Sequence, residues 1–303
     1  MSSPLVVPLE FCTDRALVGG KAAGLALLMK NGFRVPPGLC LTTRAYCDTL
    51  QASGLDPSDH WKRVRDQPVA QRELLLDHYR RAVASLVLPR SVLDLIDLEL
   101  AKLEKAFPME DGPTGGVLWA VRSSASDEDA ADATFGGIYR TVLGVPRNAI
   151  ATAILDCWAS PWTAAAVMYR QRATKACTAP AMAVILQLLL VPRAAGVAYS
   201  RHPISGRTDH VMINAVFGLA EPLVSGRIRP DHYVVETGID PAPPKLIQRD
   251  IAEKATFSIA MPWGLMDQPL PKQNRGRAVL DEHDAIALAT VVKEVVDREA
   301  GRC

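Results

Sequence analysis

The sequence lacks the features that define several large classes of protein. Lys and Arg total 34 against 33 Asp and Glu in 303 residues, so no net charge attracts nucleic acid or an anionic membrane. The longest apolar run, Ala181 to Val191, is shorter than the roughly 20 residues that a membrane span needs. We therefore expect no nucleic-acid partner and no membrane partner, and any anion site must be local.

Cysteines are few and scattered. The six include no C-x-x-C pair and have no nearby histidine at metal-ligand spacing. The N-terminus has no basic start followed by a continuous apolar stretch, so it does not have the pattern of a signal peptide. These absences predict reduced thiols and a cytoplasmic location.

The chain contains both helical and strand-like periodicities, and no repeat, low-complexity tract or linker divides it. Ser91 is expected to cap a helix that resumes after Pro89. We predict one α+β unit over residues 1–303, with mainly antiparallel sheets and two lobes, of about 1–179 and about 180–303. Helical patterns cover residues 20–30, the region 58–108, 149–172 and 281–301, whereas strand patterns cover 39–43, 116–124, 139–145, 181–191, 195–200, 210–216 and 232–236.

Two glycines and a lysine open the first helical segment, within "LVGGKAAGLALLMKNGFRVPPG". The first amides of a helix have no partner within the helix, so an anion can bind there. Gly19 and Gly20 would let a phosphate approach the backbone closely, and Lys21 would add a positive charge. The same pattern also begins many ordinary surface helices, so both interpretations stay open.

A second stretch, "WAVRSSASDEDAADATFGGIYRTVLGV", places an arginine at the end of a strand. Arg122 could grip phosphate with its fork of donors, and Gly136 and Gly137 could fold over the phosphates before the next strand begins near Thr141. The acidic loop that starts at Ser126 would then become ordered when nucleotide binds. The alternative is a hairpin with a solvated acidic loop.

A third stretch runs from "VILQ" through "GVAYSRHPISG" and "NAVFGLAEPLVSG" to "PDHYVVE". Glu221 and Asp231 are expected in turns after apolar strands, where a carboxylate can reach Mg²⁺ or a ribose. Each could equally be a turn or cap residue.

In this order, the three stretches resemble the N-terminal nucleotide-binding domain of the phosphoenolpyruvate-utilising enzymes. These are phosphoenolpyruvate synthase, pyruvate phosphate dikinase and the rifampin phosphotransferases. The resemblance covers nearly the whole chain. It implies an ATP-grasp fold, in which two lobes enclose ATP between sheets and present its phosphates to a histidine on a separate swivelling domain.

The resemblance also implies roles for individual residues. Lys21 and Arg122 match the family's phosphate-binding lysine and arginine, and would be the catalytic groups through those contacts. Gln187 matches the edge of the adenine pocket. Glu221 matches the acid near the ribose and cofactor, which makes it the candidate Mg²⁺ ligand. The loop over the phosphates is matched by Gly136, Gly137 and Thr141.

The chain departs from the family in two respects. None of its six histidines stands in the family's T-S-H-A setting, so we expect no swivelling phosphohistidine domain and no pyruvate domain here; His202 stands where relatives often have an acid. The sequence stops at "REAGRC", before the family's D-I-E-W-A and Q-x-R-P stretches. Those stretches supply a magnesium-binding acid and a phosphate-contacting arginine.

The leading hypothesis is the ATP-dependent component of a phosphotransferase, which holds Mg-ATP for transfer to a histidine on another domain or chain. One alternative is a regulatory or truncated nucleotide-binding module without turnover of its own. Another is a structural homologue that has lost ATP. The phosphoryl acceptor stays open among pyruvate, an antibiotic hydroxyl and a protein histidine.

Overall fold

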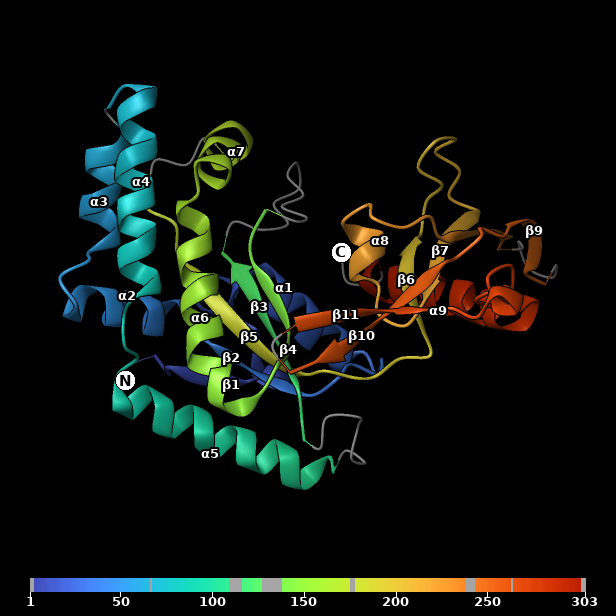
Figure 1. Ribbon diagram of the computed structural model, residues 1–303, viewed down its shortest axis with the longest axis horizontal. Coiled ribbons are helices and arrows are strands. Elements are labelled where there is room, and N and C mark those ends of the chain that lie inside the picture. Colours follow the sequence, from blue (N-terminus) through green and yellow to red (C-terminus); the bar gives the residue numbers. More distant parts are fainter. Residues whose placement is uncertain are drawn as a thin grey trace. The chain divides into compact units, whose positions relative to one another are not determined.

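The chain divides into two compact units, each with its own sheet (Figure 1). Unit 1 comprises Met1–Leu189 with Pro262–Gly264, and unit 2 comprises Leu190–Met261 with Leu265–Cys303. All strand pairings within the two main sheets are antiparallel, which confirms the predicted α+β class. The computed structural model describes residues 3–65, 67–108, 116–126, 138–174, 178–237, 243–262 and 264–300.

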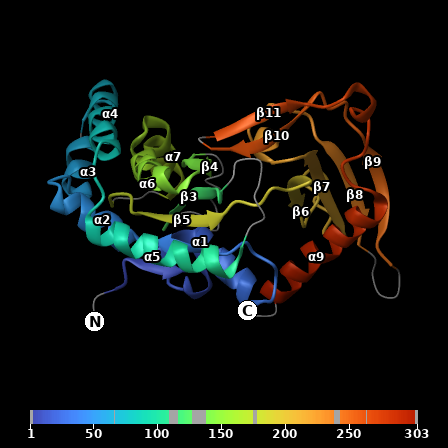
Figure 2. The same cartoon turned by 60° about the horizontal axis from the view of Figure 1, so that its bottom comes forward.

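Unit 1 is built around a five-stranded sheet in the order β1-β2-β5-β3-β4. Its central strand, β5, is buried along its whole length, as its mostly apolar sequence predicts. Helix α1 packs on one face of β3 and β5, and α6 packs on the other (Figure 2). The strands are β1 (Val6–Pro8), β2 (Gly38–Leu41), β3 (Trp119–Ala125), β4 (Thr141–Val145) and β5 (Met182–Leu188).

The predicted helical region of unit 1 is confirmed, but two details differ. Helix α5 begins at Arg90 because the carbonyl of Pro89 already accepts the first helical hydrogen bonds, so Ser91 is not the cap. The long helix expected over 149–172 is interrupted at Pro161, which lacks an amide hydrogen. The helices are α1 (Arg15–Lys30), α2 (Thr43–Ala52), α3 (Pro57–Arg65), α4 (Val69–Ala84), α5 (Arg90–Ala106), α6 (Ile150–Ala159) and α7 (Ala164–Thr174).

Unit 2 holds a four-stranded sheet in the order β6-β7-β8-β9, with α9 packed along one face (Figure 2). A separate hairpin, β10–β11, and the single-turn helix α8 complete it; the sequence pattern does not predict β9, β10 or β11. The elements are β6 (Ala194–Tyr199), β7 (His210–Phe217), α8 (Glu221–Val224), β8 (Asp231–Glu236), β9 (Lys245–Asp250), β10 (Thr256–Met261), β11 (Gly264–Pro269) and α9 (Glu282–Ala300).

Helix length and polarity bear on membrane association. Over the described ranges, every helix is either too short or too polar to cross a bilayer.

The four cysteines in the described part of the chain, Cys12, Cys40, Cys47 and Cys157, are free thiols.

Candidate functional site

Helix α1 is broken at Gly19, immediately before the Gly-Lys pair. Gly19 adopts φ 79° and ψ 170°, and the helix resumes at Gly20 and runs to Lys30. A Cβ atom at Gly19 would lie 2.2 Å from the carbonyl oxygen of Ser124. Only glycine fits here, because both the positive φ and the close approach exclude a side chain. The predicted start at Gly20 is therefore the second segment of a helix that already begins at Arg15.

Ser124 of β3 clamps this break. Its hydroxyl donates to the carbonyl oxygen of Val18 at 2.8 Å and accepts from the amide of Ala22 at 3.1 Å. One side chain thus satisfies a carbonyl before the break and an amide after it. Lys21 lies between these bonded positions and is half-buried. The clamp fixes the lysine's backbone at the end of β3.

Arg122 and Gln187 come together on the face of the sheet that packs against α1. The guanidinium donates to the Gln187 side-chain oxygen at 3.0 Å, and the Gln187 amide donates to the carbonyl of Pro36 at 2.8 Å. Gln187 is buried and Arg122 is half-buried. Because residues two apart in a strand share a face, Arg122 and Ser124 both project toward α1.

Thr141 lies on the other side of Arg122, at the start of the edge strand β4. The two residues are paired across β3 and β4, and Thr141 is exposed. Four of the predicted residues, Lys21, Arg122, Thr141 and Gln187, therefore lie on α1, β3, β4 and β5, which pack or pair with one another in unit 1. Gly136 and Gly137 lie outside the described residues, as does the acidic loop beyond Ser126.

The pKa of the Cys157 thiol on α6 is affected by charged groups near this site. Burial, together with the adjacent Asp156 carboxylate, raises the pKa of this thiol to about 12, and the charges of Arg140 and Lys21 oppose the increase. The thiol contacts the carbonyls of Val121 and Arg140 at 3.8 and 3.5 Å. Two cations therefore act on one buried point beside β3.

Glu221 lies in unit 2, at the first position of α8. Its carboxylate forms an ion pair with Arg227, which also binds Asp267 of β11 at 3.2 Å. The hydrogen bond with Glu221 raises the pKa of the Arg227 guanidinium. Glu221 thus offers one carboxylate oriented by an arginine, and carboxylate oxygen is the ligand type that Mg²⁺ prefers.

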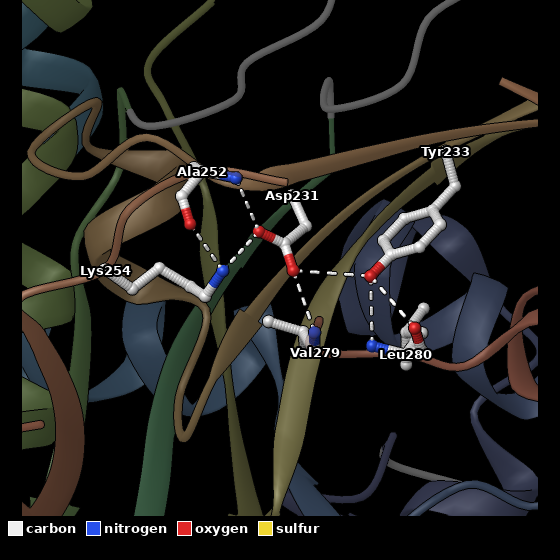
Figure 3. A network of polar contacts seen from close by, with 6 residues as sticks. All are labelled: Asp231, Tyr233, Ala252, Lys254, Val279 and Leu280. Carbon is white, nitrogen blue, oxygen red and sulfur yellow. Dashed lines mark hydrogen bonds and ion pairs between the residues drawn. The ribbon is translucent and has the colours of Figure 1, made fainter. Parts of the chain in front are cut away.

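Asp231 does not occupy the turn expected from the sequence. It is the first residue of β8 and is fully buried, where it forms an ion pair with Lys254 (Figure 3). Its carboxylate also accepts from the amides of Ala252 and Val279 at 3.0 and 2.8 Å, and from the Tyr233 hydroxyl at 3.3 Å. These contacts occupy the carboxylate oxygens, so Asp231 holds chain segments together.

His202 has a local structural role. Its Nδ1 atom accepts from the amides of Ile204 and Ser205 at 3.3 and 3.2 Å, which closes the turn between β6 and β7. Within the described ranges, two groups of side chains could bring three metal-ligand atoms together: Asp209, His210 and Glu236, and Asp281, His283 and Asp284. Neither contains a residue predicted from the sequence, and Arg207 already pairs with Asp209 at 2.5 Å.

Comparison with known proteins identifies the chain's relatives. A family model described as the pyruvate phosphate dikinase AMP/ATP-binding domain matches residues 15–298. A rifampicin phosphotransferase from Streptomyces sviceus is 32% identical over 288 residues, which cover 93% of this chain and 31% of the relative. A probable phosphoenolpyruvate synthase from Pyrococcus horikoshii is 28% identical over 284 residues, covering 82% and 34% respectively. The chain thus spans about a third of the length of these relatives.

Proposed function

The chain belongs to the family of the pyruvate phosphate dikinase AMP/ATP-binding domain, and from that premise we propose that it holds Mg-ATP for phosphoryl transfer to a histidine on another domain or chain. The observation that carries the proposal is the clamped break at Gly19. It places the backbone of Lys21 at a helix start beside the strand that bears Arg122. A helix start next to two cations has the chemistry of a phosphate site.

The proposed roles follow from side-chain chemistry. Lys21 would act as a point charge on the phosphates, and Arg122 as a fork of donors held by the Gln187 carboxamide. Gln187 would border the adenine, and Thr141 with Gly136 and Gly137 would bound the phosphates. Phosphoryl transfer depends mainly on positioning and charge neutralisation, and these groups supply both.

Glu221 is the proposed Mg²⁺ ligand. Mg²⁺ usually binds one or two carboxylates together with substrate phosphates, and the exposed part of Glu221 fits that requirement. When bound, the ion would neutralise charge on the phosphates. Arg227 would orient the carboxylate through its ion pair with Glu221.

The acceptor and the location are the remaining parts of the proposal. An acceptor histidine on a separate domain is supported by the relatives, which are about three times as long as this chain. A cytoplasmic location is supported by the free thiols among the described cysteines.

Calorimetry with Mg-ATP tests the binding. We expect the wild-type chain to bind and Lys21→Ala to bind roughly ten- to a hundredfold more weakly, the usual cost of losing a charge-assisted contact. Lys62→Ala is the control, because Lys62 is an exposed lysine of α3 whose ion pair among the described residues is with Asp59 at the surface. Equal affinity for wild type and Lys21→Ala would remove Lys21 from the site.

A second candidate function is binding without turnover. The observation in its favour is that the Glu221 carboxylate already pairs with Arg227, which competes with a metal for the same oxygens. Isotope exchange between ATP and its cleavage products separates the two candidates. We expect exchange near background for this chain alone and a clear increase when a histidine-bearing domain of a relative is added. No increase on addition would favour the second candidate.

A further inference from the structure

Arg140 combines a fixed backbone with an exposed side chain. Its carbonyl oxygen accepts from the Ser123 amide at 3.1 Å and from the Cys157 thiol at 3.5 Å. These bonds tie its main chain to β3 and α6, whereas the side chain is exposed. Replacing the side chain therefore leaves the structural hydrogen bonds of this residue in place.

The neighbours of Arg140 are the residues of the phosphate site proposed above. It directly precedes Thr141, which is paired with Arg122. It is bonded to Ser123, and the next residue, Ser124, clamps the helix segment that carries Lys21. Three cationic side chains thus come from α1, β3 and the residue before β4. The opposing effect of both Arg140 and Lys21 on the pKa of the buried Cys157 thiol is consistent with this closeness.

The charge of Arg140 has no described counterpart. Among the residues that the structure describes, no carboxylate lies within ion-pair distance of its guanidinium. By contrast, Arg147, two residues beyond the other end of β4, pairs with Asp97 and Glu104. Gathering like charges costs free energy unless an anion binds among them.

We propose that Arg140 is a third cation of the phosphate site and contacts the terminal phosphates of a bound nucleoside triphosphate. This inference rests on the proposed function and adds to it a residue that selects for phosphate number. The exposed guanidinium can reach the β- and γ-phosphates of a nucleoside triphosphate. A nucleoside monophosphate lacks these two phosphates, so the guanidinium would make no such contact with it. Arg140 thus favours ATP over AMP.

Calorimetry with Mg-ATP and with AMP tests this role. We expect Arg140→Gln to weaken ATP binding by about tenfold and AMP binding by less than about twofold, because one charge-assisted contact to the outer phosphates is lost. Arg140→Lys should restore most of the ATP affinity. Arg90→Gln is the matched control: it removes the same charge from an exposed surface position of unit 1, which within the described residues pairs with Asp94, and should leave both affinities unchanged.

The outcomes separate this inference from the proposed function. If wild type binds ATP, Lys21→Ala weakens that binding and Arg140→Gln does not, then Arg140 has no part in the site while the proposed function stands. An equal loss of ATP and AMP affinity in Arg140→Gln would also overturn the inference, because a general effect on the fold predicts it. Failure of the wild-type chain to bind ATP at all would remove both.

Discussion

In unit 1 a guanidinium meets a neutral carboxamide, Arg122 with Gln187, whereas in unit 2 an ammonium meets a carboxylate, Lys254 with Asp231. The unit 2 pair is buried, and backbone amides and a tyrosine occupy the rest of the carboxylate (Figure 3). Arg122 is half-buried, and its bond to Gln187 orients its charge without neutralising it. The Lys254–Asp231 pair of unit 2 neutralises its own charges, whereas the Gln187 carboxamide in unit 1 carries no charge to offset that of Arg122.

The largest expected effect comes from breaking the buried pair of unit 2. Lys254→Met would leave the Asp231 carboxylate buried beside an apolar side chain, which typically costs about 3–5 kcal/mol of stability. Denaturant unfolding measures this cost. The double variant Asp231→Asn with Lys254→Met should recover part of the loss, because no charge is then left buried. A single variant as stable as wild type would contradict the assignment of this pair to structure.

A second, smaller loss is expected from closing the break in α1. Gly19→Ala adds a Cβ atom 2.2 Å from the Ser124 carbonyl at a positive φ, so we expect about 2–4 kcal/mol of destabilisation together with weaker ATP binding. Gly54→Ala is the matched control, because Gly54 also has a positive φ but has open space around it. It should lose only the roughly 1 kcal/mol of backbone strain and keep its ATP affinity.

The Arg122 contact should affect binding more than folding. Arg122→Ala is expected to weaken Mg-ATP binding by about 1.5–3 kcal/mol, since a charge-assisted phosphate contact is lost. Arg147→Ala provides the contrast, because Arg147 pairs with Asp97 and Glu104 at the surface and should change stability slightly but not affinity. Calorimetry measures the Mg-ATP affinity of both variants, and thermal melting measures their stability. The comparison between the units fails if Arg122→Ala destabilises the fold and leaves ATP affinity intact.

The smallest effect concerns His60, in the helical part of unit 1. Burial, with a contribution from the Arg63 charge, lowers the pKa of His60 to about 4, and its ring stacks on Tyr79 at 3.9 Å. The unfolded chain therefore binds the proton first as pH falls. The contribution of neutral His60 to the free energy of unfolding is fully present above about pH 6.5 and is lost as pH falls toward about 4.

His60→Phe should remove this part of the pH dependence, because the aromatic stack is kept and the titrating group is gone. Partial exposure of the ring limits the expected difference between wild type and variant to under about 2 kcal/mol between pH 6.5 and 4. Melting temperatures of the two proteins across that range give the measurement. Parallel pH profiles would show that His60 is not responsible.

Sequence patterning located most elements of unit 1 and the first half of unit 2. The end of α1 at Lys30, the buried strand β5 and the helix α9 all followed from local periodicity and turn residues. Strand β9 was missed because its sequence is polar and exposed along most of its length. No alternation then distinguishes it from a loop.

The candidate site was predictable as a set of residue types. Lys21 after two glycines, Arg122 at a strand end and Gln187 at the end of an apolar strand have visible chemistry in the sequence. Ser124 was not singled out, although it positions Lys21. One signal could have found it: alternation along β3 puts Ser124 on the same face as Arg122.

The sequence by itself determined the fold class, the order of most elements and which residues could bind an anion, because these depend on periodicity and residue chemistry within short windows. Only the tertiary structure decided what each charge does. Asp231 and Glu221 both follow apolar strands in the sequence, yet Asp231 is buried against Lys254 and Glu221 is partly exposed beside Arg227. Their surroundings come from segments distant along the chain, and burial and partners set whether a charge stabilises the fold or stays available for a ligand.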